Sequence, residues 1–378
     1  MVNTSEDRNK FMKICHVIND LSRGGAETHL FSLVELQVKQ GSEVNVLLLG
    51  RDLDRFVSLE SDFVELGVKL KRLKGPKKLQ GLNPVSILIA SRYFNNQKFD
   101  IIHTHSPRSD FLVYISQKIF KKINKRIVSI HGKYGTYLQG NKYIDILRKF
   151  FINKQAKIWL SADGVIVISE SIKEWLTELN PLIKPVVIPY GITINNQEIN
   201  FTNNNIGFLG RLNKNKGIED LVDVFNSIAN EETKQSEQLA LSIGGVGSDI
   251  YVKNLQKIAI DKNIKFLGYV ENRNEFFKSL SVFVFPSYSE GLGLVLLEAM
   301  SYGVLCIARD VAPMNKIINH KYNGFLFTNN EDLKKTIQTS LKLNQKEKTQ
   351  VIKNAFGTIE NSYSIIQMYL SIEKVYNR

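Results

Sequence analysis

The stretch that decides the fold is VFVFPSYSEGLGLVLLEAM, residues 282–300. Its first part, Val282–Phe285, is a continuous apolar run stopped by Pro286, which is typical of a strand buried on both faces. The part after Gly293 is rich in residues of high helix propensity, so we expect a helix to begin there. A buried strand that turns directly into a helix is the repeating unit of a parallel sheet covered by helices.

Two carboxylates accompany this strand-to-helix turn. Glu290 lies at the corner, and Glu298 follows about two turns along the expected helix. Unbonded backbone N–H groups at such a corner attract phosphate, because the glycines allow close approach and a helix start carries partial positive charge. Carboxylates beside a phosphate site are suited to sugar hydroxyls, which donate hydrogen bonds. The combination indicates a pocket for a nucleotide sugar.

The rest of the chain reads as two series of strands alternating with helices. Strands of the first series are expected at 12–18, 44–49, 101–103, 126–130, 164–168 and 186–188, and those of the second at 206–209, 239–243, 264–267, 282–285 and 304–307. Alternation of this kind predicts an α/β protein with two Rossmann-like domains whose parallel sheets face across a cleft. We place the domains at 1–190 and 191–357, with 358–378 returning to the first, and an asparagine-rich linker at 195–205.

Composition argues against a disordered chain and against a chain that spans a membrane. The chain has 378 residues, 43% of them hydrophobic, which is enough for two folded cores. Its two cysteines, Cys15 and Cys306, lie in apolar stretches and are expected to be buried thiols of a reducing compartment. No run approaches the roughly 20 apolar residues of a spanning helix, and residues 1–10 lack the apolar centre of a signal peptide. We therefore expect a cytoplasmic protein.

Positive charge is concentrated in one half of the chain. Residues 1–190 hold 29 Lys and Arg against 18 Asp and Glu, and Asp145 is the single acid between Lys118 and Lys157. A basic half favours an anionic partner. The stretch 141–160 mixes apolar and basic residues at helical spacing, so it could lie on a membrane surface or could simply pack on its own domain. We favour a peripheral position on the inner face of the cell membrane.

Polar and flexible residues gather where the expected strands end. Ligands of open α/β sheets bind beyond the carboxyl ends of the strands, so these corners are the candidate sites. They are 23–25, 103–106 and 130–132 in the first series, and 210–217, 244–247 and 290–293 in the second.

Taken in order, these motifs resemble the GT-B-fold retaining glycosyltransferases of family GT4, also called glycosyl transferases group 1. The resemblance runs from about Met12 to about Tyr376. It rests on Gly24-Gly25-Ala26-Glu27, Ile130-His131-Gly132, Ile188-Pro189-Tyr190-Gly191, Gly210-Arg211-Leu212 with Lys216-Gly217, Gly244-Gly245-Val246-Gly247, and the Glu290/Glu298 pair. The most specific of them is the last, an E-G-x-G followed by a second glutamate.

The resemblance implies roles for residues of the second domain. Arg211 and Lys216 would hold the donor diphosphate and stabilise it as it leaves, without a metal or other cofactor. Glu298 would accept hydrogen bonds from the ribose, and Glu290 would contact the transferred sugar. Two surface cations at a turn and a solvated helix glutamate are the ordinary alternatives.

The remaining roles concern backbone groups and one histidine. Gly293 and Leu294 would offer N–H groups to the phosphates, and Gly245 would lie near the nucleotide. Gly25 would approach the donor phosphate and the acceptor; the alternative interpretation is that it is an ordinary turn glycine. His131 would lie near the transferred sugar.

The activity implied is retaining transfer of a hexose from a nucleotide-diphosphate sugar to a lipid-linked saccharide, or to a lipopolysaccharide or capsule intermediate. The family is thought to react on one face of the sugar, with the leaving phosphate taking the proton of the acceptor. Two alternatives remain: another GT-B enzyme such as a nucleotide-sugar epimerase, and a basic nucleic-acid-binding or membrane-binding protein. No aromatic and basic RNA-binding motif is visible, so we expect no nucleic-acid partner.

Weaker signals do not point to a metal. His103 and His105 form an H-x-H, but the sequence shows no third ligand, and a zinc site needs one. The D-x-D at 52–54 is best explained as a solvated loop. Arg309 departs from the family pattern, where a small or polar residue is usual, and so does Tyr190-Gly191-Ile192-Thr193.

Overall fold

The structure is a computed structural model that describes residues 11–22, 24–50, 58–73, 83–120, 123–134, 142–195, 204–231 and 239–378, without the side chains of 142–148. The chain forms two compact units, one of residues up to Pro189 together with Met368–Arg378, and one of Tyr190–Gln367. The second unit therefore extends further along the chain than the boundary we placed at 357.

The first unit alternates strands and helices. Its elements are β1 Lys13–Ile18, α1 Gly25–Lys39, β2 Glu43–Leu48, α2 Glu60–Glu65, β3 Lys69–Arg72, α3 Pro84–Gln97, β4 Ile101–Thr104, α4 Pro107–Phe120, β5 Lys125–Ile130, α5 Lys142–Leu160, β6 Gly164–Val167, α6 Glu170–Leu179 and β7 Val186–Val187. The strands form one parallel sheet in the order β3-β2-β1-β4-β5-β6-β7. The order reverses between β1 and β4, and such a switch point is where ligands of doubly wound sheets bind.

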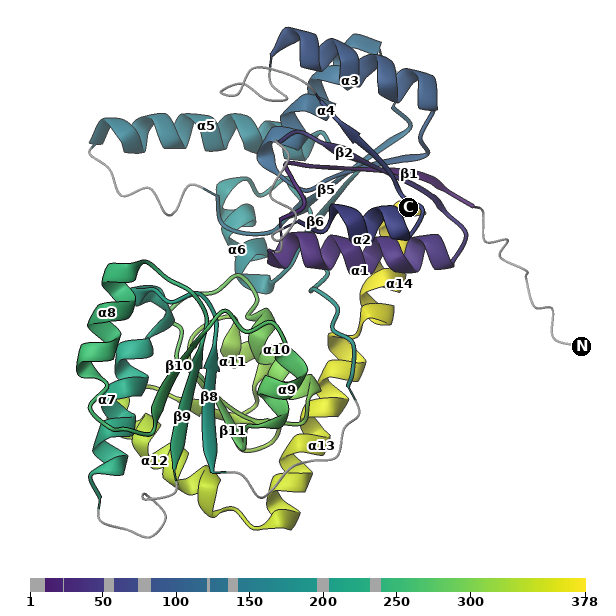
Figure 1. Ribbon diagram of the computed structural model, residues 1–378. Helices are drawn as coiled ribbons and strands as arrows, with labels where there is room; N and C mark the ends of the chain where they lie inside the picture. The colour runs from purple at the N-terminus through teal and green to yellow at the C-terminus, as the bar shows by residue number, and fades with distance from the viewer. Residues whose placement is uncertain are drawn as a thin grey trace, which may run out of the picture. The chain divides into compact units, whose positions relative to one another are not determined.

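Helices cover both faces of this first sheet (Figure 1). Side chains of alternate strand residues point to opposite faces. Cys15 and Val17 therefore pack with Phe94 of α3 and Leu112 of α4, in one core cluster. The intervening His16 faces the other side, where it meets Gln37 of α1.

The second unit repeats the pattern. Its elements are β8 Asn205–Leu209, a 3-10 helix Lys214–Lys216, α7 Ile218–Ala229, β9 Ala240–Gly244, α8 Asp249–Ile258, β10 Ile264–Gly268, α9 Arg273–Lys278, β11 Val282–Phe285, α10 Leu294–Ser301, β12 Leu305–Arg309, α11 Met314–Ile317, β13 Phe325–Phe327, α12 Asn330–Lys342 and α13 Gln345–Ser362. The sheet order is β10-β9-β8-β11-β12-β13, again all parallel, with its switch point between β8 and β11. The predicted α/β class with two Rossmann-like units is confirmed.

The strand Val282–Phe285 lies at the centre of the second sheet, as its sequence predicts. All four of its residues are buried, because helices cover both faces of the sheet. The helix α10 begins at Leu294, directly after the corner that carries Glu290.

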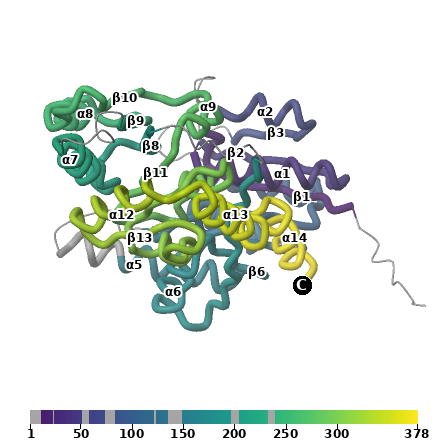
Figure 2. The backbone as a smooth tube through the Cα atoms, turned by 90° about the horizontal axis from the view of Figure 1, so that it is seen from below, coloured from purple at the N-terminus to yellow at the C-terminus, as the bar shows by residue number. Residues whose placement is uncertain are grey.

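The last helix, α14 Ile365–Tyr376, continues from α13 to the C-terminus (Figure 2). Its residues from Met368 on belong to the first unit. There the buried side chain of Tyr376 meets His103, and its carbonyl oxygen accepts a hydrogen bond of 2.8 Å from Lys125 Nζ.

Two strands were not predicted, and several predictions cannot be followed. The missed strands are β3, which reads KLKR, and β13, which reads FLF, and each lies at an edge of its sheet. Arg23, the D-x-D at 52–54 and most of the linker fall outside the described residues. Cys15 and Cys306 are buried free thiols, as expected. None of the described helices is both long and apolar enough to cross a bilayer.

Candidate functional site

Three loops of the second unit meet at the carboxyl edge of its sheet. The loop after β8 pairs with the loop after β9, since Leu212 N donates to Val246 O at 2.8 Å. The same loop is joined to the one after β11, because Tyr288 N donates to Asn215 O at 2.9 Å. These hydrogen bonds connect the three loops across the β8/β11 switch point.

An ion pair spans this switch point. Lys216, at the end of the 3-10 helix after β8, donates through Nζ to Glu290 Oε1 in the loop after β11. Each side chain is only 14% exposed. Gly217 makes the close approach possible: it has φ +62°, and a Cβ there would overlap the carbonyl oxygen of Pro286. The structure thus brings together two predicted site residues that are 74 positions apart.

Glu298 has a different partner. Arg273, at the start of α9, places NH1 at 2.7 Å from both of its carboxylate oxygens. Burial raises the pKa of Glu298, and the charge of Arg273 acts against that rise. Sequence reasoning missed Arg273, because it stands in a polar stretch of sequence with no motif around it.

Arg309, which departs from the family pattern, forms hydrogen bonds that hold the loop carrying Glu290. It is buried and donates through Nε to Pro286 O at 2.9 Å and through NH2 to Asp220 Oδ2 at 2.5 Å. Its guanidinium also lies 4.1 Å from the ring centroid of Tyr288, whose hydroxyl donates to the same carboxylate at 2.5 Å. The unusual arginine therefore anchors the β11 loop to α7.

The other predicted residues of this unit occupy the same edge. Arg211 follows β8 and its side chain is exposed. Gly293 is the N-cap of α10 with φ +84°, so Leu294 N–H belongs to the first helical turn, where backbone donors have no intrahelical acceptor. Gly245 follows β9 with φ +136°, and a Cβ there would overlap the carbonyl oxygen of Gly210. The packing of the loops after β8 and β9 therefore requires glycine at position 245, whether or not this residue contacts a ligand.

In the first unit, the predicted His131 follows β5 and joins a group of histidines. His16, His103 and His105 carry ring nitrogens within 4.8 Å of one another, so the structure supplies the third histidine that the H-x-H lacked. Both ring nitrogens of each already have a hydrogen-bond partner, which a metal would have to displace. Burial lowers the pKa of His16 and of His131 to about 4, and lowers those of His103 and His105 well below the usual range.

Gly25 is exposed and is the first residue of α1, the helix that follows β1 in the chain. The neighbouring Glu27 has a pKa raised to about 6, mainly by burial. His131 thus comes directly after the carboxyl end of β5, and Gly25 begins the helix that follows β1.

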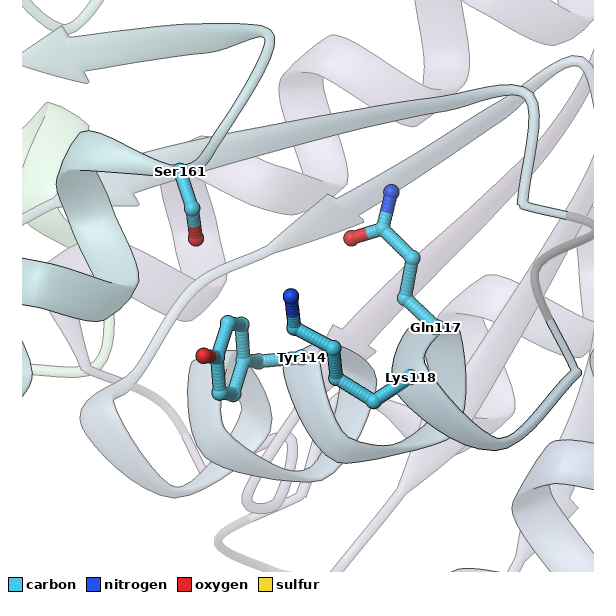
Figure 3. A pocket seen from close by; sticks show the side chains of 4 residues that line it. All are labelled: Tyr114, Gln117, Lys118 and Ser161. Carbon is cyan, nitrogen blue, oxygen red and sulfur yellow. The ribbon is translucent and has the colours of Figure 1, made fainter.

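A pocket of the first unit lies away from these residues. Figure 3 shows Tyr114, Gln117, Lys118 and Ser161 around a cavity of about 330 Å³. It adjoins the amino end of β5, because Ser161 Oγ accepts a hydrogen bond of 2.7 Å from Arg126. None of the predicted site residues is among the four that line it.

Comparison with known families assigns the chain. Residues 23–196 match the family model described as Glycosyltransferase Family 4, and residues 192–357 match the model described as Glycosyl transferases group 1. Each match covers one of the two Rossmann-like series. The chain belongs to the GT-B glycosyltransferases.

Relatives of this GT-B glycosyltransferase include enzymes named for surface polysaccharides. The O-antigen biosynthesis glycosyltransferase WclY of Escherichia coli is 24% identical over 297 residues, which cover 74% of this chain and 80% of WclY. The capsular polysaccharide biosynthesis glycosyltransferase CapM of Staphylococcus aureus is 23% identical over 314 residues, 77% of this chain and 80% of CapM.

Solved structures confirm the predicted GT-B fold. The Anabaena protein HepE in complex with UDP superposes with a TM-score of 0.78 and 18% identity, covering 97% of this chain and all of that one. The same protein has also been solved with UDP-glucose.

Proposed function

We propose that this glycosyltransferase is a retaining, metal-independent GT4 enzyme that moves a hexose from a nucleotide-diphosphate sugar to a lipid-linked saccharide. The observation that carries the proposal is the Lys216–Glu290 pair across the β8/β11 switch point. A cation there can neutralise a diphosphate, and a carboxylate beside it can accept hydrogen bonds from the hydroxyls of the attached sugar.

The neighbouring groups fit the same donor. Arg211 lies in the loop of Lys216 and would add a second fixed charge to the diphosphate, while the N–H groups of Gly293 and Leu294 would donate to its oxygens. Glu298 keeps further lone pairs besides those that accept from Arg273, so it can also accept from ribose hydroxyls. In this proposal the protein positions the reactants and stabilises the leaving diphosphate, which itself takes the proton of the acceptor.

The names of the relatives support the choice of donor and acceptor. HepE was solved with UDP and with UDP-glucose, which favours a nucleotide-diphosphate hexose as donor. WclY and CapM are named for O-antigen and capsule synthesis, which favours a growing surface polysaccharide as acceptor. In this proposal the acceptor is linked to lipid, so the enzyme would meet it at a membrane.

The described part of α5 fits a membrane surface. Trp159 is buried on one side of the helix, whereas Phe150 and Phe151 are 51% and 65% exposed. The exposed Lys154 places Nζ 4.4 Å from the ring centroid of Phe150. Exposed aromatic rings beside lysines bind the interface of anionic lipids, because the rings bury apolar area and the lysines attract the headgroups.

A screen of nucleotide sugars by thermal shift tests the donor. A donor present at 100 times its Kd should stabilise the native protein by about 2.7 kcal/mol. We expect one nucleotide-diphosphate hexose to raise the Tm, Glu298→Ala to reduce that rise, and the exposed control Glu271→Ala to preserve it. With this donor and an acceptor, the anomeric configuration of the product should be retained, as read by NMR. Inversion, or donor turnover without transfer to any acceptor, would refute the mechanism.

Co-sedimentation with lipid vesicles tests the membrane position. The double variant Phe150→Ser/Phe151→Ser should bind anionic vesicles about ten-fold more weakly than the wild type, because two large apolar side chains no longer enter the interface. Leu182→Ser, which changes an equally exposed apolar residue outside α5, should bind like the wild type. Equal binding of all three proteins would remove α5 from the membrane contact.

A further inference from the structure

The cavity between α4 and the end of α5 is lined by groups that suit an anion. Tyr114, Gln117 and Lys118 belong to α4, and Ser161 directly follows α5. None of these four described lining residues is acidic, and they present an ammonium, a carboxamide and two hydroxyls. Figure 3 shows the Lys118 ammonium directed into the space among these side chains. The cavity volume of about 330 Å³ lies at the lower end of the range for sites that bind small ligands.

A buried arginine lies behind the wall of this cavity. The side chain of Arg126 is fully buried, and its NH2 donates to Ser161 Oγ at 2.7 Å and to Ile158 O at 3.0 Å. Its other two nitrogens, Nε and NH1, have no hydrogen-bond partner within the described part of the chain. The guanidinium also lies 5.6 Å from the ring centroid of Tyr114. Arg126 therefore adjoins two of the four residues that line the cavity.

The positive charge beside this cavity is not balanced by an ion pair. Within the described ranges, Arg126 and Lys118 approach the ring of Tyr114, at 5.6 and 5.5 Å from its centroid, and neither forms an ion pair with a carboxylate. The neighbouring acids are engaged elsewhere, because Asp110 accepts hydrogen bonds from two side chains of α5 and Asp163 accepts one from the backbone N–H of Arg126. An arginine keeps its proton, and a buried charge is costly without compensation. A bound anion would supply that compensation.

The cavity lies at the edge of the first sheet that is opposite to the candidate site residues. Arg126 is the second residue of β5, whereas His131 directly follows the last one. The five residue steps between them span roughly 16 Å at the rise of a parallel strand, so a ligand in the cavity would not reach His131. The cavity instead adjoins the C-terminal end of α5, the helix that we assign to a membrane surface. This position favours a ligand that belongs to the membrane.

We propose that this cavity binds a phosphate group, with the Lys118 ammonium and the Tyr114 hydroxyl donating to its oxygens and the Arg126 guanidinium adding positive charge from behind. Phosphate suits the cavity because its oxygens accept from donors that approach from several directions, and because lysine binds it as a point charge. The source that the position favours is the headgroup of an anionic phospholipid, and free phosphate offers the same chemistry. The site does not depend on the proposed transfer reaction, whereas the lipid source rests on the proposed membrane position.

Thermal unfolding in inorganic phosphate tests the site. The Tm of each protein is compared between sodium phosphate and sodium chloride at equal ionic strength, so that charge screening is the same in both. We expect phosphate to raise the Tm of the wild type, because the bound ion stabilises the native state. Lys118→Met should lose most of this rise. Tyr114→Phe, which keeps the ring and removes only the hydroxyl, should lose part of it.

Lys154→Met is the matched control for this measurement. It removes an exposed cation of α5 that does not line the cavity, so its response to phosphate should equal that of the wild type. Phosphate bound near Lys216, and the general effect of phosphate as an excluded salt, contribute equally to all four proteins. Equal responses of the four proteins, including no response in any of them, would overturn the proposal.

Vesicle binding identifies the source of the phosphate. The probes are vesicles of phosphatidylcholine alone and of phosphatidylcholine mixed with phosphatidylglycerol. Lys118→Met and Lys154→Met lose the same charge, so they should bind anionic vesicles equally if both lysines act only through the surface potential. We expect Lys118→Met to bind the mixed vesicles about ten-fold more weakly than Lys154→Met, with no such difference on phosphatidylcholine alone.

The two measurements separate the possible outcomes. If Lys118→Met loses the response to phosphate but binds the mixed vesicles as well as Lys154→Met does, the site stands with a soluble phosphate as its ligand, and the lipid source is refuted. Neither measurement uses a sugar donor. If no nucleotide sugar binds the protein, the proposed function fails, while the phosphate responses of Lys118→Met and Tyr114→Phe still decide the site.

Discussion

Replacing Lys216 by methionine should lower the turnover of the transfer reaction by about 10²–10³-fold, the usual cost of removing one group that stabilises developing charge in an active site. The ammonium of Lys216 is held beside Glu290 in a largely buried position, where water screens its charge poorly. In the proposed reaction this charge acts on the diphosphate as it leaves. The measurement is kcat at saturating donor, with the Tm recorded to show that the fold is intact.

Lys214 supplies the matched control. It belongs to the same 3-10 helix as Lys216, but its side chain is exposed, so Lys214→Met should keep turnover within about two-fold of the wild type. Lys216→Met with wild-type turnover would remove Lys216 from the site.

The second large effect concerns stability. Gly245→Ala should destabilise the second unit by more than about 3 kcal/mol, because the residue has φ +136° and its new Cβ would overlap the carbonyl oxygen of Gly210. Backbone atoms cannot move aside as a flexible side chain can, so the loops after β8 and β9 would have to separate. Urea unfolding followed by circular dichroism measures the change.

Gly357 is the control for this substitution. It lies within α13, and a Cβ there would meet no atom within 4 Å, so Gly357→Ala should raise stability by about 0.5–1 kcal/mol. A Gly245→Ala protein that unfolds like the wild type would contradict the expected overlap. The pair also has a practical consequence, because loss of donor binding in Gly245→Ala would not by itself identify a contact with the nucleotide.

The central strands of both sheets could be predicted because their composition is unambiguous. A strand such as Val282–Phe285, covered on both faces, must be apolar throughout, and this leaves a clear signal in the sequence. The two missed strands, β3 and β13, are edge strands. The sequence KLKR of β3 is charged because an edge strand borders water, and charge there also discourages pairing with other chains.

The candidate site was predicted only where a local motif marks it. Glu290, Gly293 and Glu298 stand within one strand-turn-helix unit, so the local sequence indicated a nucleotide-sugar pocket there, and the family resemblance implied the role of each residue. Arg273 and Arg309 carry no such mark, because each acts on a residue far away in the sequence. The sequence showed Arg309 only as a departure from the family pattern. Its contact with the β11 loop depends on the pairing of β12 with β11, which places Arg309 beside that loop.

The sequence by itself determined the alternation of strands and helices, and with it two parallel sheets and the corners where polar residues collect. These features follow from local periodicity and local propensity, which depend on neighbours along the chain. Only the tertiary structure decided the pairing of Lys216 with Glu290, of Arg273 with Glu298, and of Gln37 with His16. Side chains from separate strand ends meet only when the order of strands in the sheet is set, and that order depends on packing of the whole unit.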